Sequence, residues 1–133
     1  AAIERFAALG ITASVQPSFV SSDGPWVGQR VGARLATIHP FASMLAAGIP
    51  LRAGSDAPVE IPDPWRAMAS ARAHATNPKE SVSAAQALGI YQTGPLRPGS
   101  AADLVVVDRD PLTTDRIQDT RVLAVWRDGK QVV

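Results

Sequence analysis

The chain has 133 residues, 46% hydrophobic and 19% charged, which suits one globular domain with a core of its own. Its 13 basic and 12 acidic residues nearly cancel, and no basic stripe interleaves with aromatics, so we expect no nucleic-acid partner. The absence of cysteine excludes disulfides, thiolate nucleophiles and sulfur-ligated zinc, and it favours a cytoplasmic location. No apolar run approaches the roughly 20 residues of a membrane helix, so we expect no membrane partner.

The first residues have helical spacing. Ile3, Phe6 and Leu9 recur every third position, and Gly10 follows as a helix C-terminal glycine would. This helix begins without a cap or an initiator methionine, so we expect either a piece of a larger protein or a processed natural terminus. Residues 11–16 alternate and are rich in β-branched side chains, which predicts a short strand.

The next stretch is rich in loop-forming residues. The Ser, Asp, Gly and Pro content of residues 17–31 predicts a long loop, and such loops are often functional. Apolar spacing predicts a helix over residues 34–47, which Pro40 kinks or splits in two and Gly48 ends. Residues 49–53 are predicted to form a second short strand.

Two further helices are predicted after the second strand. Asp63 is a good N-cap, with Pro64 in the favoured first helical position. Ser81 or Ser83 is expected to cap the helix after that. Short strands that alternate with helices indicate parallel βα units, so we expect an α/β fold class.

The character of the sequence changes near residue 94. A turn-rich segment leads into apolar strands predicted over residues 103–108 and 122–126. Asp128-Gly129 is a strong signal for a hairpin turn into the last residues. Three antiparallel strands cannot easily bury both faces of a sheet alone, so we expect this part to pack on something else.

Asp56 is the candidate catalytic residue. It stands just past the second predicted strand, within Gly54-Ser55-Asp56-Ala57-Pro58, where α/β barrels place catalytic groups. Gly54 would let the backbone pass close to a neighbour or ligand, and Pro58 would stiffen the exit of the loop. A carboxylate here can bind a metal ion and move a proton to or from a metal-bound water. The structural alternative is that Asp56 caps the following helix.

Other polar residues give weaker signals. His39 and His74 match no metal-ligand spacing, and a histidine near a helix end is an ordinary structural feature. Gln16 ends the first predicted strand. Its side chain either faces the same pocket as Asp56 or forms hydrogen bonds with the backbone of the following loop. The last third also contains clustered aspartates that match no calcium loop and are expected in turns: Asp103, Asp108, Asp110 and Asp115.

At Gly54-Ser55-Asp56-Ala57-Pro58-Val59 the sequence resembles the amidohydrolase superfamily, in its amidohydrolase family 3 branch. The resemblance extends over nearly the whole chain, in the order of the family. The upstream part looks like the region of the seventh barrel strand, and the downstream part like the return into a β-sandwich domain and its final hairpin. The further matching segments are Arg5–Ile11, Ser14–Pro17, Asp63-Pro64, Gly94–Val106 and Trp126–Lys130.

The resemblance implies a (β/α)8 TIM barrel that carries a small β-sandwich built from both chain ends. Residues 1–93 would be the last βα units of the barrel, and residues 94–133 the C-terminal strands of the composite sandwich. It also implies metal-dependent hydrolysis of carbon–nitrogen bonds in small amide-type substrates, typically with zinc. In such hydrolases the aspartate after the eighth strand meets the metal, activates the attacking water and passes the proton to the leaving amine. Asp56 matches that position.

Two departures from the family pattern define the alternatives. Catalytic zinc usually needs about three protein ligands. The family's other metal ligands belong to earlier strands, so this chain offers only one of them. The stretch after Tyr91-Gln92-Thr93-Gly94 is shorter than usual, which shortens the link between barrel and sandwich. One alternative is a non-catalytic fragment that folds or assembles without turnover, as a homo-oligomer or with missing barrel segments. A second alternative is a β-hairpin interaction module in the last third.

Overall fold

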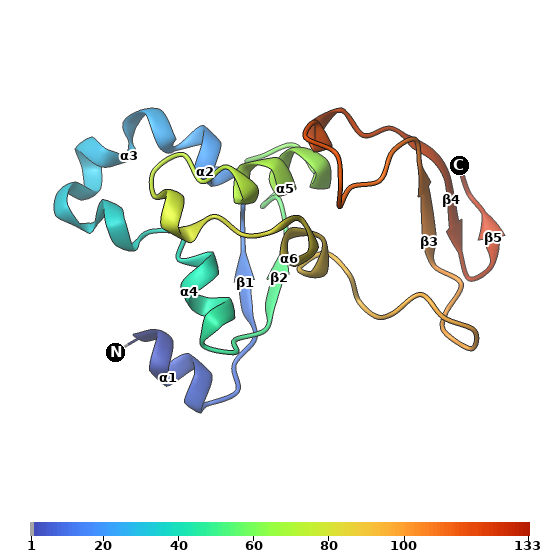
Figure 1. Ribbon diagram of the computed structural model, residues 1–133, viewed down its shortest axis with the longest axis horizontal. Coiled ribbons are helices and arrows are strands. Elements are labelled where there is room, and N and C mark those ends of the chain that lie inside the picture. Colours follow the sequence, from blue (N-terminus) through green and yellow to red (C-terminus); the bar gives the residue numbers. More distant parts are fainter. Residues whose placement is uncertain (1) are drawn as a thin grey trace.

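The computed structural model describes residues 2–133 and has a mixed α/β fold with two small sheets (Figure 1). A parallel sheet lies among the helices, and an antiparallel sheet lies at one end of the molecule. Within the described residues no helix has the length and apolar character needed to cross a membrane. The elements in chain order are α1 (Ala2–Ala8), β1 (Ala13–Val15), α2 (Phe19–Ser22), α3 (Gly24–Val31), the 3₁₀ helix η1 (Gly32–Thr37), α4 (Phe41–Ala46), β2 (Leu51–Ala53), α5 (Pro64–Arg72), η2 (Pro78–Glu80), α6 (Ala84–Gly89), β3 (Leu104–Val107), η3 (Ile117–Asp119), β4 (Val122–Arg127) and β5 (Lys130–Gln131).

The strands β1 and β2 pair in parallel, as the alternation of helices and strands predicts. Ala13 lies opposite Leu51, and Val15 opposite Ala53. The amide of Gly54 extends the pairing with a hydrogen bond of 3.0 Å to the carbonyl oxygen of Val15. Within the part of the chain that the structure describes, β2 is the only strand beside β1, so the other edge of β1 is open.

The core forms where the parallel pair meets the surrounding helices. Strand and helix side chains contribute to one apolar cluster, in which the short strands are buried between helical segments. In Figure 1, α4 and α6 flank the strand pair on opposite sides of the view. The most deeply buried members of the cluster are Val20, Phe41, Ile49, Leu51, Met68, Ala71, Ala87 and Ile117.

The prediction of a long loop over residues 17–31 is wrong, because this stretch forms α2 and α3. Val20 and Val27 are buried, so each helix has an apolar side that packs inward. Pro25 lies at the start of α3, where its missing N–H would have no partner within the helix anyway. Ser, Asp, Gly and Pro are favoured at helix starts as well as in loops, so their presence does not distinguish a loop from two short helices. The burial of Val20 and Val27 agrees with the helices.

The region 34–47 is split at Pro40, as predicted. The 3₁₀ helix η1 ends before this proline, and α4 begins directly after it. His39 therefore lies between two helices, not inside one as its sequence position suggested. Its φ is 48°, a left-handed conformation that turns the chain into α4.

Helix caps follow the sequence closely. Asp63 caps α5, since its Oδ1 accepts hydrogen bonds of 3.0 and 3.1 Å from two backbone amides of the first turn. Of the two candidate serines, Ser83 caps α6, and it forms a reciprocal capping box with Gln86. Ser81 instead accepts a hydrogen bond of 3.1 Å from the amide of His74.

The last strands form an antiparallel sheet in the order β3-β4-β5, as predicted. Leu104 lies opposite Trp126, which in turn lies opposite Gln131. The turn between β4 and β5 has positive φ at both central residues, 49° at Asp128 and 73° at Gly129. Two positive φ values fit the twist of a two-residue hairpin, which is why an Asp-Gly pair predicts this turn.

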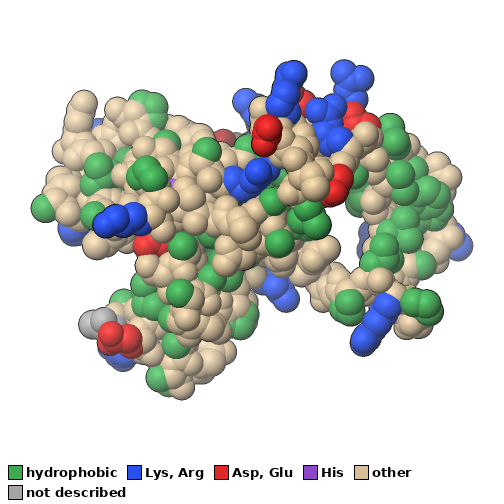
Figure 2. Space-filling view, in the orientation of Figure 1, with side chains coloured by type: hydrophobic (Ala, Val, Ile, Leu, Met, Phe, Trp, Pro, Cys, Tyr) green, Lys and Arg blue, Asp and Glu red, His purple; other side chains and the backbone are tan. Residues whose placement is uncertain are grey.

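Apolar side chains remain exposed over the antiparallel sheet, where Figure 2 shows them gathered at one end of the molecule. Contact with the helical part comes instead from η3, where Ile117 is 1% exposed and belongs to the main core. The division of the chain at residue 94 stays a prediction. The exposed apolar residues of β3 and β4 are Val105, Val106, Val122 and Leu123.

Candidate active site

The carboxyl ends of β1 and β2 lie at the same edge of the parallel pair. The hydrogen bond between Gly54 and Val15 keeps the two chains side by side as they leave the strands. Gln16 directly follows β1, and Asp56 lies shortly after β2. This is the edge at which α/β barrels carry their catalytic groups. Gln16 is half-buried and Asp56 is exposed, and no hydrogen bond between these two described residues joins their side chains.

The backbone places Asp56 at the start of a tight turn. Its φ is 58°, and its carbonyl oxygen accepts a hydrogen bond of 2.9 Å from the amide of Val59. Aspartate adopts this left-handed conformation more readily than most residues. Within the same turn, the peptide bond between Ala57 and Pro58 is cis. The turn leaves the carboxylate of Asp56 exposed to solvent.

Asp56 caps no helix, so the structural alternative for it is wrong. The helix that follows is capped by Asp63. The expected reason for Gly54 also finds no support in the described residues, because a Cβ atom placed there would meet nothing within 4 Å. Asp56 is thus an exposed carboxylate that makes no hydrogen bond or ion pair with any other residue that the structure describes.

His74 is a structural histidine. It is 2% exposed, and its Nε2 lies 3.0 Å from the carbonyl oxygen of His39. Its Nδ1 accepts a hydrogen bond of 3.1 Å from the amide of Asn77. One ring nitrogen therefore donates and the other accepts, which is the pattern of a neutral imidazole. Neither nitrogen is open to a metal ion in this arrangement.

His39 packs beside His74, with ring centroids 6.2 Å apart, and beside Phe41. Burial lowers the pKa of His39, and the neighbouring His74 lowers it further, whereas Asp23 acts in the opposite direction. The two histidines and Phe41 are in mutual ring contact at the start of α4. This cluster lies apart from Asp56 in the sequence and shares no hydrogen bond with it among the described residues.

The described residues do not complete a zinc site. No three His, Cys, Asp or Glu side chains within residues 2–133 are grouped so that they could hold a metal ion. Catalytic zinc usually has three protein ligands and one open position. Asp56 offers one carboxylate, and both ring nitrogens of His74 are already engaged.

A tyrosine and an aspartate also interact near the ends of α5 and α6. Burial, and after it the negative charge of Asp63, raises the pKa of Tyr91 to about 12. Tyr91 follows α6, and the neighbouring Ile90 accepts a hydrogen bond of 3.1 Å from the amide of Ala53 at the end of β2. The tyrosine is therefore a neutral phenol at physiological pH, anchored next to the strand that leads to Asp56.

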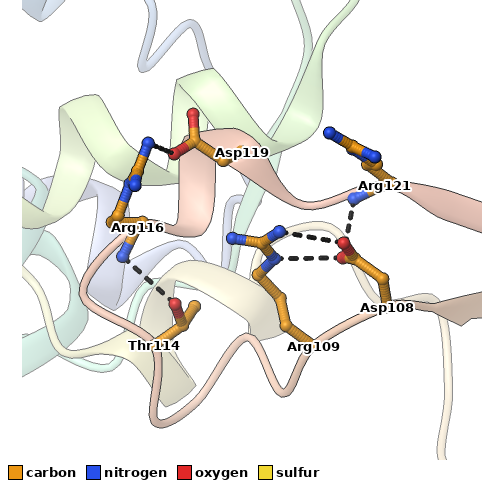
Figure 3. Close-up of polar contacts among 6 residues, drawn as sticks. All are labelled: Asp108, Arg109, Thr114, Arg116, Asp119 and Arg121. Carbon is orange, nitrogen blue, oxygen red and sulfur yellow. Dashed lines mark hydrogen bonds and ion pairs between the residues drawn. The ribbon is translucent and has the colours of Figure 1, made fainter.

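Sequence reasoning missed a group of arginines in the last third. Arg109, Arg116 and Arg121 line a cavity of about 410 Å³ together with Asp119. Figure 3 shows the three arginines and their carboxylate neighbours Asp108 and Asp119. The signal that could have found the group is the alternation of arginine and aspartate within residues 108–121.

Comparison with known proteins gives consistent matches over most of the chain. The sequence pattern described as "Amidohydrolase family" matches residues 1–133. The chain is 30% identical to "Putative amidohydrolase YtcJ" of Bacillus subtilis, over 87% of the chain and 26% of that protein. It is 29% identical to "N-substituted formamide deformylase" of Arthrobacter pascens, over 95% of the chain and 27% of that protein. It is 32% identical to "Protein LONG AFTER FAR-RED 3" of Arabidopsis thaliana, over 96% of the chain and 26% of that protein. The chain thus spans about a quarter of the length of these curated relatives, and no solved structure matches it significantly.

Proposed function

Because the chain belongs to the amidohydrolase family, we propose that it forms part of a metal-dependent hydrolase that cleaves carbon–nitrogen bonds in small amide-type substrates. The family is generally metal-dependent, and one relative is named a deformylase of N-substituted formamides, which supports an amide-type substrate. The observation that carries the proposal is the exposed carboxylate of Asp56 at the shared carboxyl edge of two parallel strands. A catalytic carboxylate at this edge is the arrangement expected of an α/β barrel enzyme.

We assign Asp56 the handling of the proton. A carboxylate without a structural partner can accept a proton from an attacking water and later donate it to a leaving amine. The turn at Asp56 supports this role. The next helix, α5, is capped by Asp63, so the carboxylate of Asp56 is not used as a helix cap. We propose that Gln16, which follows the neighbouring strand, faces the same pocket as Asp56.

The metal is proposed to be zinc or a similar divalent ion, with Asp56 as one ligand. The remaining ligands would have to come from residues outside this chain, because residues 2–133 contain no suitable group of three. Once complete, such a site would polarise the scissile carbonyl and lower the pKa of a bound water.

We further propose that residues 1–93 are the last βα units of a TIM barrel and residues 94–133 the C-terminal strands of a β-sandwich. Two observations support this. The outer edge of β1 lacks a strand partner among the described residues, whereas parallel sheets are normally continuous and covered. The antiparallel sheet leaves Val105 and Leu123 more than half exposed, as a sheet that lacks its covering layer would.

A chimera tests the proposal. The 133 residues would replace the aligned segment of the formamide deformylase from Arthrobacter pascens, and hydrolysis of an N-substituted formamide would be measured. We expect an active chimera in which Asp56→Asn lowers kcat by about 10²–10⁴-fold, the usual contribution of a general acid–base. Asp115→Asn is the matched control, because Asp115 is an exposed carboxylate in the last third.

Equal activity of the Asp56 and Asp115 variants would refute the role of Asp56. A second function, a non-catalytic fragment, is favoured by the lack of a metal-binding group in residues 2–133. A chimera that folds, as judged by circular dichroism and metal content, but does not hydrolyse the substrate would support that function instead.

A further inference from the structure

A hollow lined by arginines lies between the end of β3 and the start of β4. It is an open depression in the surface, with a volume of about 410 Å³. The lining residues are Arg109, Arg116, Asp119 and Arg121, so the walls are charged rather than apolar. In Figure 2, basic and acidic side chains gather near the junction of the helical part and the antiparallel sheet.

The guanidinium of the first arginine pairs with the carboxylate of Asp108. Nε and Nη2 of Arg109 donate to the two carboxylate oxygens of Asp108 over 3.0 and 2.9 Å, a two-point contact. Asp108 is itself fixed, because it also accepts a hydrogen bond of 2.9 Å from the amide of Arg121. The bond from Arg109, and then the amide of Arg121, holds the pKa of Asp108 well below its usual range. The anchor is therefore ionised at every pH at which the protein is ordinarily handled.

The second arginine is held from the other side of the hollow. Arg116 Nη2 lies 2.6 Å from Oδ2 of Asp119, three residues along the chain across η3. That oxygen is buried and makes no well-aligned hydrogen bond, so the contact with Arg116 is an ion pair. The amide of Arg116 in addition donates to Oγ1 of Thr114 over 3.1 Å, which fixes the backbone of this arginine (Figure 3).

The third arginine adds a further positive charge beside Asp108. The backbone of Arg121 pairs with Asp108 in both directions, but its guanidinium makes no ion pair with any residue that the structure describes. Each guanidinium carries five N–H donors, and the contacts to Asp108 and Asp119 use only a few of them. The three guanidinium groups thus have two carboxylates, Asp108 and Asp119, as neighbours. Some of their N–H donors remain free to bind a ligand in the hollow.

We propose that this hollow binds a small doubly charged oxyanion, namely phosphate, either free or as the terminal group of a phosphomonoester. Arginine is weakly hydrated, and its planar fork matches the oxygens of phosphate better than a point charge does. Asp108 orients the guanidinium of Arg109 through a two-point contact, so less side-chain entropy is lost at this residue when the anion binds. This site lies in the last third of the chain and does not depend on the function proposed for Asp56.

Titration of the 133-residue chain with inorganic phosphate tests the proposal. Binding would be followed by calorimetry at neutral pH and constant ionic strength, with chloride as the balancing anion. We expect saturable one-to-one binding that Arg121→Gln and Arg109→Gln each weaken by about tenfold or more, since each loses charge-assisted hydrogen bonds. Arg97→Gln is the matched control, because Arg97 is an exposed arginine in the segment that precedes β3. It should change the affinity by less than about twofold.

Two further probes separate the sources of the phosphate. Phenyl phosphate should bind at least as tightly as inorganic phosphate if the site takes a phosphomonoester, and much more weakly if it takes the free anion. Arg121→Lys keeps the charge but loses the fork, so it should bind phosphate more weakly than the parent chain. A signal that rises without saturation, or equal weakening in Arg97→Gln and Arg121→Gln, would overturn the proposal. Circular dichroism of each variant, compared with the parent, verifies that the fold is intact.

Discussion

Arg72, in the last turn of α5, donates a hydrogen bond from Nη1 to the carbonyl oxygen of Thr114 over 3.0 Å. This bond joins the helical part of the chain to the segment that leads into β4. Shortly after Thr114, Ile117 is buried in the main apolar cluster. The connection before β3, residues 92–103, is exposed throughout. The antiparallel sheet is therefore anchored to the helical part through the segment around η3.

Ile117→Ala tests this anchor. Removal of a buried aliphatic side chain loses apolar burial and leaves a cavity, so the free energy of unfolding should fall by about 2–5 kcal/mol. Urea denaturation followed by circular dichroism measures it. Leu112→Ala is the control from the same segment, and because Leu112 is 47% exposed it should cost no more than about 0.5 kcal/mol. Similar losses in both variants would contradict the anchoring role.

Glu80 caps a helix that is distant from it in the sequence. It is 8% exposed, and its carboxylate accepts hydrogen bonds of 2.9 and 2.5 Å from the amide and hydroxyl of Ser43. Ser43 lies in the first turn of α4, whose N-cap residue, Pro40, forms no side-chain cap. A carboxylate at this end of a helix also interacts favourably with the helix dipole.

Glu80→Gln should therefore lower the free energy of unfolding by about 1–3 kcal/mol, the cost of a weakened hydrogen bond to a charged group. Thermal or urea unfolding measures the change. Glu60→Gln provides the comparison, because Glu60 makes no hydrogen bond to another described residue and should change stability by no more than about 0.5 kcal/mol. Equal stability of the two variants would show that Glu80 does not stabilise α4.

Tyr91 gives a direct spectroscopic test, because it is the single tyrosine of the chain. Its pKa is raised to about 12 by burial and by Asp63, against about 10 in an unfolded chain. The folded state thus holds this proton more tightly, so its contribution to stability is complete below about pH 10 and is lost as the pH rises towards 12.

Ultraviolet absorbance of tyrosinate follows this titration. The folded chain should ionise with a midpoint near pH 12, and the urea-unfolded chain near about pH 10. Asp63→Asn keeps a good helix cap but removes the charge, so the midpoint should fall part of the way, since burial remains. A midpoint near about 10 in the folded chain would contradict the burial of Tyr91.

The parts of the fold that the sequence predicts depend on local chemistry. Asp63 before Pro64 and Asp128-Gly129 each determine a cap or turn within a few residues, and both form as expected. The cap of α6 is predicted at Ser81 or Ser83, and the structure has it at Ser83. The parallel pairing of the two short strands follows from their alternation with helices along the chain. The prediction for Asp56 rests on its place after a strand end, which is equally local, and its catalytic role stays a prediction.

The parts that the sequence does not predict depend on distant contacts. Residues 17–31 have the composition of a loop, yet they form α2 and α3, in which Val20 and Val27 are buried. Nothing local shows that Ile117 packs into the core of the helical part. The arginine-lined hollow likewise arises only when the end of β3 meets the segment before β4.

Asp56 is proposed as one ligand of a metal site whose other ligands lie outside this chain. Calorimetric titration with Zn²⁺ of the 133-residue chain, beside the Asp56→Asn variant, tests it most directly. We predict no binding tighter than roughly micromolar in either protein, because one carboxylate does not make a zinc site. Tight one-to-one binding by the parent chain that is lost in Asp56→Asn would contradict the claim, since the chain would then build a complete metal site of its own.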